Sequence, residues 1–238
     1  MRIALTIAGS DSGGAAGIQA DLKTFHQFGV FGTTAITAVT AQNTTGVRAW
    51  QALPTKLVAQ QIDALADDLF PAAVKSGMLG SAAIVATVTE RIAGRLAPLA
   101  LLVTPNLNEA EILVEDEVRT PDQMEAAGRA LVAMGARAAL VKGGHLTGPT
   151  LVDVLVHGKS ARRFTHERID TTSTHGTGCT LSAAITAGLA LGRPLEQAVA
   201  DALDFVHRAI AAAPGLGQGH GPLNHFVPGP PRPPQDGL

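Results

Sequence analysis

The chain is poor in several residue types, and each scarcity narrows the functions it can have. It has no Tyr, one Trp and seven Phe among 238 residues, so it offers few aromatic surfaces on which nucleic-acid bases could stack. Its 18 Lys and Arg and 20 Asp and Glu give a formal net charge of −2 without a basic run. This balance favours neither nucleic acid nor an anionic membrane as a partner. We therefore expect a small-molecule partner.

Cysteine is equally scarce. Cys179 is the only one, so neither an intrachain disulfide nor a Cys-rich zinc site can form, which fits a reducing compartment. The apolar run at residues 2–8 is too short for a signal peptide and ends at Gly9. No later apolar stretch reaches membrane-spanning length without interruption. We therefore expect a cytoplasmic protein.

Aliphatic residues dominate the remainder of the chain. Hydrophobic residues make up 46% of the sequence, most of them Ala, Val, Leu and Ile, and this length is ordinary for one α/β domain. We expect a single domain over residues 1–226. The Pro-rich segment 227–238 cannot form regular structure, and we expect it to be disordered.

Short apolar runs alternate with helical patterns along the chain. The expected strands cover residues 2–8, 30–40, 72–76, 101–104, 138–142, 151–157 and 161–169. The expected helices cover residues 18–28, 54–69, 81–92, 121–134, 178–191 and 195–213. This alternation predicts a three-layer α/β/α fold with a central, mostly parallel sheet, whose ligands bind beyond the carboxyl ends of the strands.

The strongest chemical motif is His-Gly-Thr-Gly-Cys-Thr at residues 175–180, where an expected helix begins. Closely spaced glycines let backbone N–H groups converge on an anion at the positive end of a helix. The motif therefore predicts an anion hole of phosphate size. The alternative is a glycine-rich turn that only begins a helix.

A second motif places Asn106 and Glu109 just after an expected strand. Hard oxygen ligands at this spacing could hold Mg²⁺ through water molecules, beside nucleotide phosphates. The same spacing fits a capping box, in which Asn106 caps a helix and Glu109 completes the cap. Both interpretations remain open on spacing alone.

Two further segments follow strands. Lys142 precedes two glycines and could place an ammonium beside phosphates, although most strand-end lysines are merely solvated. Gln42 could donate to and accept from one edge of a heterocycle, although a surface turn explains it equally well. The segment 9–14 lacks the ending of a Walker loop, and no Rossmann fingerprint follows a strand.

Taken together, these segments closely resemble the hydroxymethylpyrimidine/phosphomethylpyrimidine kinases of the ribokinase-like superfamily. The resemblance runs in order from Met1 to about Phe226 and rests on the segments at residues 8–21, 40–44, 104–106, 142–145 and 175–179. It implies two ATP-dependent phosphorylations in thiamine biosynthesis. The first acts on the hydroxymethyl oxygen of 4-amino-5-hydroxymethyl-2-methylpyrimidine and the second on the resulting monophosphate.

The resemblance also implies roles for individual residues. Gln42 matches the glutamine that reads the pyrimidine, and the other pocket positions are Asp21, Gly9, Val39 and Met78. Many relatives in the wider superfamily carry aspartate where this chain has Cys179, which occupies the catalytic position.

On the nucleotide side, the implied cofactors are ATP and Mg²⁺, and the family suggests a homodimer. The residues that match this side are Asn106 and Glu109 for magnesium, Lys142 for the phosphates, and Gly176, Thr177 and Gly178 for the anion hole.

One departure from the family pattern is large. Relatives usually carry a strand with Asp-Pro-Val-Met, a glycine-bearing loop and a further helix between the segments that match Ser81–Gly94 and Leu96–Asn106. Here Gly94 is followed directly by Arg95. Because loss of a central strand would destabilise the sheet, we expect that residues have been omitted at this point.

Two other functions fit part of the pattern. A pyridoxal kinase of the same superfamily would need the same parts, because it also phosphorylates a primary alcohol on a heterocycle. A noncatalytic pyrimidine-binding module would keep only the pocket. Gln42 and Cys179 favour the pyrimidine, and the anion hole favours an enzyme.

Overall fold

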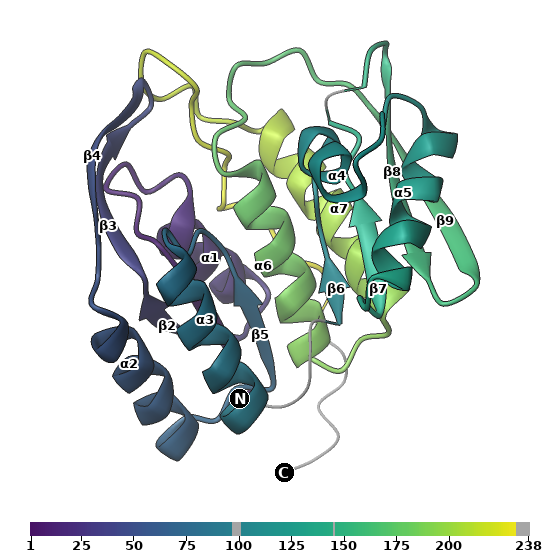
Figure 1. The fold of residues 1–238 in the computed structure, drawn as a ribbon. Helices are drawn as coiled ribbons and strands as arrows, with labels where there is room; N and C mark the ends of the chain where they lie inside the picture. Colours follow the sequence, from purple (N-terminus) through teal and green to yellow (C-terminus); the bar gives the residue numbers. More distant parts are fainter. Residues whose placement is uncertain (97–100, 145, 232–238) are drawn as a thin grey trace. The chain divides into compact units, whose positions relative to one another are not determined.

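The computed structural model describes residues 1–96, 101–144 and 146–231. The chain divides into two compact units, which we call unit 1 (residues 1–97 and 171–238) and unit 2 (residues 98–170). Each unit has its own sheet, shown with its helices in Figure 1. The expectation of a single domain over residues 1–226 stays a prediction.

Unit 1 is built on a parallel three-stranded sheet with the order β2-β1-β5. Its strands are β1 (Ile3–Ala8), β2 (Phe31–Ile36) and β5 (Ala73–Ser76), together with a separate antiparallel hairpin of β3 (Ala38–Asn43) and β4 (Gly46–Ala52). Its helices are α1 (Gly17–Gln27), α2 (Thr55–Asp68), α3 (Ala82–Arg91), α6 (Thr177–Ala190) and α7 (Leu195–Ala211), with a π-helical segment η1 (Ile92–Leu96).

Helices cover both faces of this sheet because β1 is apolar on both sides. Leu5 and Ile7 are fully buried in a core that they share with side chains of α2 and α3. The opposite face lies against α1 and α6, and α7 packs on α6 (Figure 1). A Cβ at Gly188 would lie 3.0 Å from Ala198 Cβ, so the small residues of α6 allow α7 to approach closely. The α/β class is thus confirmed.

A buried ion pair crosslinks this second face. Lys75 Nζ of β5 donates to both oxygens of Asp21 of α1 at 2.8 and 2.9 Å, and Thr6 Oγ1 of β1 donates to Asp21 at 2.6 Å. Burial raises the pKa of the Asp21 carboxyl because its charged form loses hydration, while Lys75 and Thr6 oppose that rise. The three groups tie α1 to two neighbouring strands.

Unit 2 has a four-stranded sheet with the order β6-β7-β8-β9. Its elements are β6 (Leu102–Val103), α4 (Leu107–Val114), α5 (Pro121–Ala133), β7 (Ala138–Val141), β8 (Thr150–His157) and β9 (Ser160–Glu167). Strand β6 runs parallel to β7, and the remaining neighbours are antiparallel. Leu107 and Met124 pack with Val141 and Val154 in a buried cluster, which fixes α4 and α5 on the sheet.

The expected strand at residues 30–40 is two strands, β2 and β3, separated by Thr37. The sequence interpretation placed no strand between Thr40 and Pro54, so it did not predict β4. All of β4 up to Gln51 is exposed, so it lacks the burial that makes a strand recognisable from its pattern. The β3-β4 hairpin is the main feature of unit 1 that the sequence did not indicate.

Gly94 and Arg95 are consecutive within η1, and the expectation of omitted residues stays a prediction. In the described part of the chain, β5 pairs only with β1, and β6 pairs only with β7. The expected central sheet is therefore present as two separate sheets. Among the helices of the described residues, none combines the length and the apolar composition that a membrane span requires.

Part of the Pro-rich segment falls among the described residues. Residues 227–231 form no helix or strand, and Arg208 Nη1 donates to the carbonyl oxygen of Pro228 at 2.9 Å. This part of the segment is therefore held against α7. The remainder of the expected tail, residues 232–238, lies outside the described residues.

The Asp21–Lys75 pair leads to a prediction about stability. Lys75→Met leaves a buried carboxylate without its counter-charge, and we expect this to lower the free energy of unfolding by about 3–5 kcal/mol. The matched control is the double variant Asp21→Asn/Lys75→Met, which removes both charges and should recover part of the loss. Urea unfolding measures all three proteins, and a double variant less stable than Lys75→Met would contradict the prediction.

Candidate functional site

The anion-hole motif forms the uncapped beginning of α6. Gly176 is the N-cap residue, with a φ of +85° and no side-chain capping bond. Gly178 and Cys179 follow in the first turn, where backbone N–H groups have no intrahelical acceptor. Gly178 is exposed and Cys179 is partly exposed, so these donors and the thiol lie at the surface of unit 1. A helix end of this kind attracts an anion.

Asp11 organises the loop between β1 and α1. Its carboxylate accepts backbone N–H bonds from Gly13, Ala15 and Ala16 at 2.8 to 3.0 Å. Burial alone raises the pKa of the Asp11 carboxyl, but these donors and the His175 ring lower it, and the pKa falls below its ordinary value. The loop is thus built around a buried carboxylate.

This loop packs tightly against the beginning of α6. A Cβ at Gly176 would lie 1.7 Å from the carbonyl oxygen of Ala15, a distance that no side chain can occupy. The positive φ of Gly176 also favours glycine. Both facts explain why glycine precedes Thr177 in the motif.

His175 joins this loop to the end of β3. Its Nε2 lies 3.1 Å from Asp11 Oδ2 and 2.9 Å from the amide nitrogen of Gln42. The backbone of Gln42 is held by Ser12, whose hydroxyl donates to the Gln42 carbonyl and accepts from its N–H. The predicted pyrimidine-reading residue therefore lies beside the predicted anion hole.

Three of the other predicted pocket residues lie close to the carboxyl end of β1. Gly9 donates its N–H to the carbonyl oxygen of Met78 at 3.1 Å, and a Cβ at Gly9 would lie 2.7 Å from Met78 Cε. Met78 and Val39 are each about half exposed. Asp21 differs, because it is fully buried and its oxygens bind Lys75 and Thr6. The geometry gives Asp21 a structural role, and its assignment to substrate binding stays a prediction.

The C-terminal part of unit 1 supports the anion-hole turn from within. Thr180 is fully buried, and its Oγ1 lies 2.9 Å from His225 Nε2. The N–H of His175 donates to the carbonyl oxygen of Gly221 at 3.2 Å. Burial lowers the pKa of His225 to about 4, since the charged ring would lose hydration, and the charge of Lys23 lowers it further. His225 is therefore neutral at neutral pH.

In unit 2, Asn106 and Glu109 form a capping box. Asn106 Oδ1 accepts from the Glu109 N–H at 2.9 Å, and Glu109 Oε2 accepts from the Asn106 N–H at 2.8 Å. The residue spacing had fitted both a capping box and a magnesium site, and the structure shows the capping box. The cap uses Oε2 of the exposed Glu109 and leaves Oε1 outside it, so the carboxylate could still hold a water molecule of Mg²⁺. The described residues contain no cluster of three His, Cys, Asp or Glu side chains suited to a metal.

Lys142 lies next to Asn106 in the same unit. The Lys142 N–H donates to the carbonyl oxygen of Pro105 at 2.9 Å, and the two residues form a parallel bridge at the ends of β6 and β7. Beneath them, Asp153 accepts the N–H of Gly143 at 2.9 Å. Burial raises the pKa of Asp153 to about 6, against the opposing effects of that N–H and the Lys142 charge. The predicted phosphate-side residues of unit 2 thus share one sheet edge.

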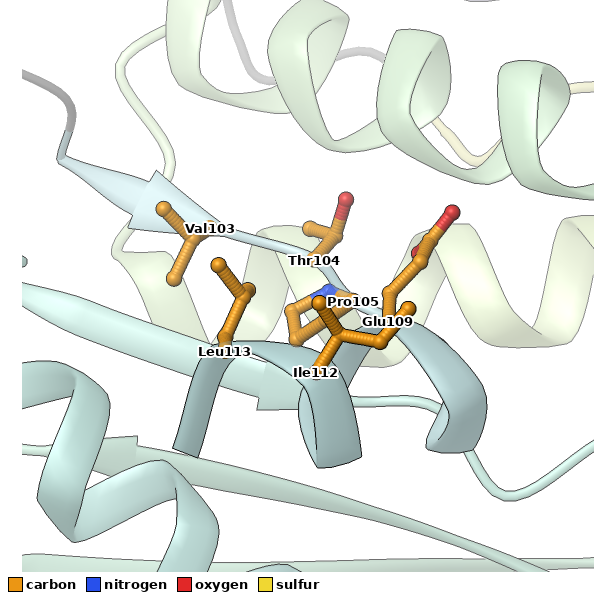
Figure 2. A pocket seen from close by; sticks show the side chains of 6 residues that line it. All are labelled: Val103, Thr104, Pro105, Glu109, Ile112 and Leu113. Atoms are coloured by element: carbon orange, nitrogen blue, oxygen red, sulfur yellow. The ribbon is translucent and has the colours of Figure 1, made fainter. Parts of the chain in front are cut away.

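A shallow hollow of about 400 Å³ lies on this unit and is lined mainly by apolar side chains. Figure 2 shows its six lining residues from β6, the following turn and α4: Val103, Thr104, Pro105, Glu109, Ile112 and Leu113. Ile112 is 77% exposed, an unusual state for isoleucine. Strand β6, which contributes Val103 to the hollow, pairs only with β7 in the described residues.

Three polar residues of these clusters received no role from the sequence. Asp11 had a usable signal, because an aspartate two residues before glycine commonly accepts that backbone N–H. His175 belonged to a quoted motif, but only the fold brings it to Gln42. Asp153 interrupts an apolar run, Leu151–Val156, and the sequence interpretation gave it no role.

Comparison with known proteins identifies relatives along most of the chain. A family model described as phosphomethylpyrimidine kinase matches residues 11–95 and 89–224. The hydroxymethylpyrimidine/phosphomethylpyrimidine kinase of Rhizobium meliloti (strain 1021) is 45% identical over 257 aligned positions, covering 94% of this chain and 97% of that protein. The alignment is longer than the 238 residues of this chain, so it contains gaps here. The two family matches overlap at residues 89–95, which include the departure at Gly94.

Solved structures give the same fold. Pyridoxal kinase from Bacillus subtilis in an ADP complex superimposes with a TM-score of 0.86 at 38% identity, covering 94% of this chain and 97% of that chain. Pyridoxal kinase from Staphylococcus aureus with AMP-PCP and pyridoxal gives a TM-score of 0.87 at 30% identity, covering 96% of both chains. These similarities place the fold among kinases that bind adenine nucleotides.

His225 leads to a prediction about pH. Its folded pKa of about 4 lies below the ordinary histidine value of about 6.5, so the unfolded state binds the extra proton between these values. Stability is therefore lost as pH falls from about 6.5 towards 4, and we expect about 2 kcal/mol of loss at pH 5. His225→Gln should remove this part of the pH dependence. Urea unfolding at pH 7 and pH 5 compares the two proteins, and equal losses would contradict the assignment.

Proposed function

The chain belongs to the phosphomethylpyrimidine kinase family, and on this basis we propose that it transfers the γ-phosphoryl group of ATP to 4-amino-5-hydroxymethyl-2-methylpyrimidine. A second transfer to the monophosphate then gives the diphosphate, for thiamine biosynthesis. One observation carries the proposal. The uncapped beginning of α6 lies directly beside Gln42, through their shared neighbour His175. A phosphate-binding turn thus adjoins a side chain suited to a nitrogen heterocycle.

The first turn of α6 supplies the charge stabilisation that phosphoryl transfer requires. The transferring group carries its negative charge on oxygens that need fixed donors. The N–H groups of Gly178 and Cys179 are such donors, because Gly176 begins the helix without a side-chain cap. Their positions are fixed before substrate binds, since Gly176 is packed against Ala15.

Cys179 is proposed to act on the attacking hydroxyl. Its thiolate accepts the proton of the hydroxymethyl group while the oxygen bonds to the γ-phosphorus, and the bond to the ADP oxygen breaks. Cys179 is partly exposed and makes no disulfide, so Sγ can meet a substrate.

The nucleotide side is proposed from unit 2. Asn106 and Glu109 would hold Mg²⁺ through water, and Lys142 would meet phosphate oxygens, as the resemblance implies. Bound Mg²⁺ would neutralise phosphate charge during transfer. The ADP and AMP-PCP complexes of the related structures support adenine nucleotide use.

The pyrimidine is favoured over pyridoxal as the substrate. The matching family model and the relative at 45% identity both carry the pyrimidine name, whereas the pyridoxal kinases compared above are 38% and 30% identical. Gln42 adds a physical reason, because an amide can pair with both a ring nitrogen and an adjacent amino group.

We also propose that the chain forms a homodimer in the cytoplasm through the β3-β4 hairpin. Val47 and Trp50 of the exposed strand β4 are each more than half exposed, and exposed apolar side chains of this kind are frequent at protein interfaces. Trp50→Glu should shift the protein towards the monomer in sedimentation equilibrium. A dimer unchanged by this substitution would place the interface elsewhere.

A coupled ADP-release assay with ATP, Mg²⁺ and the pyrimidine tests the proposed reaction. We expect turnover by the wild type and a fall in kcat of about 100-fold or more for Cys179→Ala, because the base is lost. Cys179→Ser is the matched control and should recover little, since a serine hydroxyl is a weaker base. Near wild-type turnover by Cys179→Ala would exclude the thiolate as base, and absence of turnover by the wild type would contradict the proposed reaction.

A further inference from the structure

The three side chains that meet at His175 restrict how their hydrogens can be arranged. The Asp11 carboxylate can only accept, because its low pKa keeps it ionised. His175 Nε2 lies 3.1 Å from Asp11 Oδ2, so this ring nitrogen carries a hydrogen and donates it. That conclusion holds for the neutral Nε2–H ring and for the charged ring alike.

A ring nitrogen that carries a hydrogen has no lone pair for the NH₂ group of Gln42. The Gln42 atom that lies 2.9 Å from Nε2 must therefore act as an acceptor, and the amide oxygen is the only acceptor available. The side-chain amide consequently has its oxygen towards His175 and its nitrogen on the opposite side. The proton of His175 Nε2 is shared between Asp11 and Gln42.

Hydrogen bonds to the backbone hold Asp11, His175 and Gln42 in place. Rotation of the Gln42 side-chain amide is the main motion that these bonds leave open. Ser12 holds both backbone polar groups of Gln42, and Asp11 is fixed by three backbone N–H groups. His175 is anchored through its own N–H to Gly221. Within such a frame, the rotation that exchanges the oxygen and nitrogen of Gln42 is governed by its contact with His175.

We propose that His175 is a positioning residue for substrate recognition, holding the Gln42 amide in one orientation so that it accepts from an exocyclic amino group and donates to the adjacent ring nitrogen. This inference rests on the proposed function for the identity of the heterocycle. The amide oxygen has a second lone pair, so it can accept from His175 and from a substrate amino group together.

The consequence is selectivity against a heterocycle with the reversed pattern. In the 4-oxo analogue of the pyrimidine, a carbonyl oxygen replaces the amino group and the adjacent ring nitrogen carries a hydrogen. A fixed amide then meets acceptor with acceptor and donor with donor, and both bonds are lost. An amide that is free to rotate could pair with either heterocycle.

The first experiment measures the hydrogen on His175 directly, without any substrate. Long-range ¹H–¹⁵N NMR of the full chain reports which imidazole nitrogens carry hydrogens, with His175→Gln used to assign the signal. We expect a hydrogen on Nε2. An Nε2 without a hydrogen would overturn the proposal, whatever the protein's substrate is.

The second experiment measures selectivity by calorimetric binding of the 4-amino and 4-oxo pyrimidines. His175→Leu removes the donor, and we expect the preference for the amino form to fall by about 10-fold or more, because the amide can then rotate. His175→Gln keeps an N–H donor near the same position and should retain most of the preference. Equal preferences in the Leu variant and the wild type would overturn the positioning role, as would equal losses in both variants.

The two experiments separate this inference from the proposed function. If the wild type binds neither pyrimidine, the proposed substrate is wrong, and the NMR result alone then supports or overturns the amide orientation. If the wild type binds the amino form and Nε2 carries a hydrogen, the selectivity of the two variants decides whether His175 acts through Gln42.

Discussion

The buried carboxylate of Asp11 is the interaction on which the candidate site of unit 1 depends. It gathers the backbone N–H groups of one loop and binds the ring of His175. Three segments that are distant in sequence thereby meet at one point: the loop after β1, the end of β3 and the beginning of α6. A buried charged group needs hydrogen-bond donors around it. Here the donors are the backbone N–H groups of the loop after β1 and the ring of His175, and both belong to the candidate site.

The interruption between β5 and β6 is the second constraint. Lys75 on β5 remains buried because its charge is neutralised by Asp21, so this short strand is tied to α1 as well as to β1. Strand β6 has only two residues, and the exposed Ile112 and Leu113 line the hollow together with its Val103. The family model matches residues on both sides of the interruption, 11–95 and 89–224.

Sequence reasoning was most successful where one local pattern sets the structure. The beginning of α6 followed from its glycines, and the apolar run of β1 followed from its composition. Sequence reasoning was less successful where the same residue spacing fits two different structures. Asn106 and Glu109 fit a metal motif and a capping box, and the structure shows the capping box. Strand β4 escaped notice because its side chains are exposed, so no burial pattern marks it.

The sequence by itself determined the α/β class, the family and the position of the glycine-rich turn that begins α6, because these depend on short-range patterns and on motif order. Only the tertiary structure decided which polar groups meet. Asp21 of α1 is buried against the sheet in an ion pair with Lys75. Asp11 and His175 are 164 residues apart in the sequence and share a hydrogen bond. The reason is physical: burial and pairing arise from long-range packing, and local sequence carries no record of which distant donor will neutralise a given carboxylate.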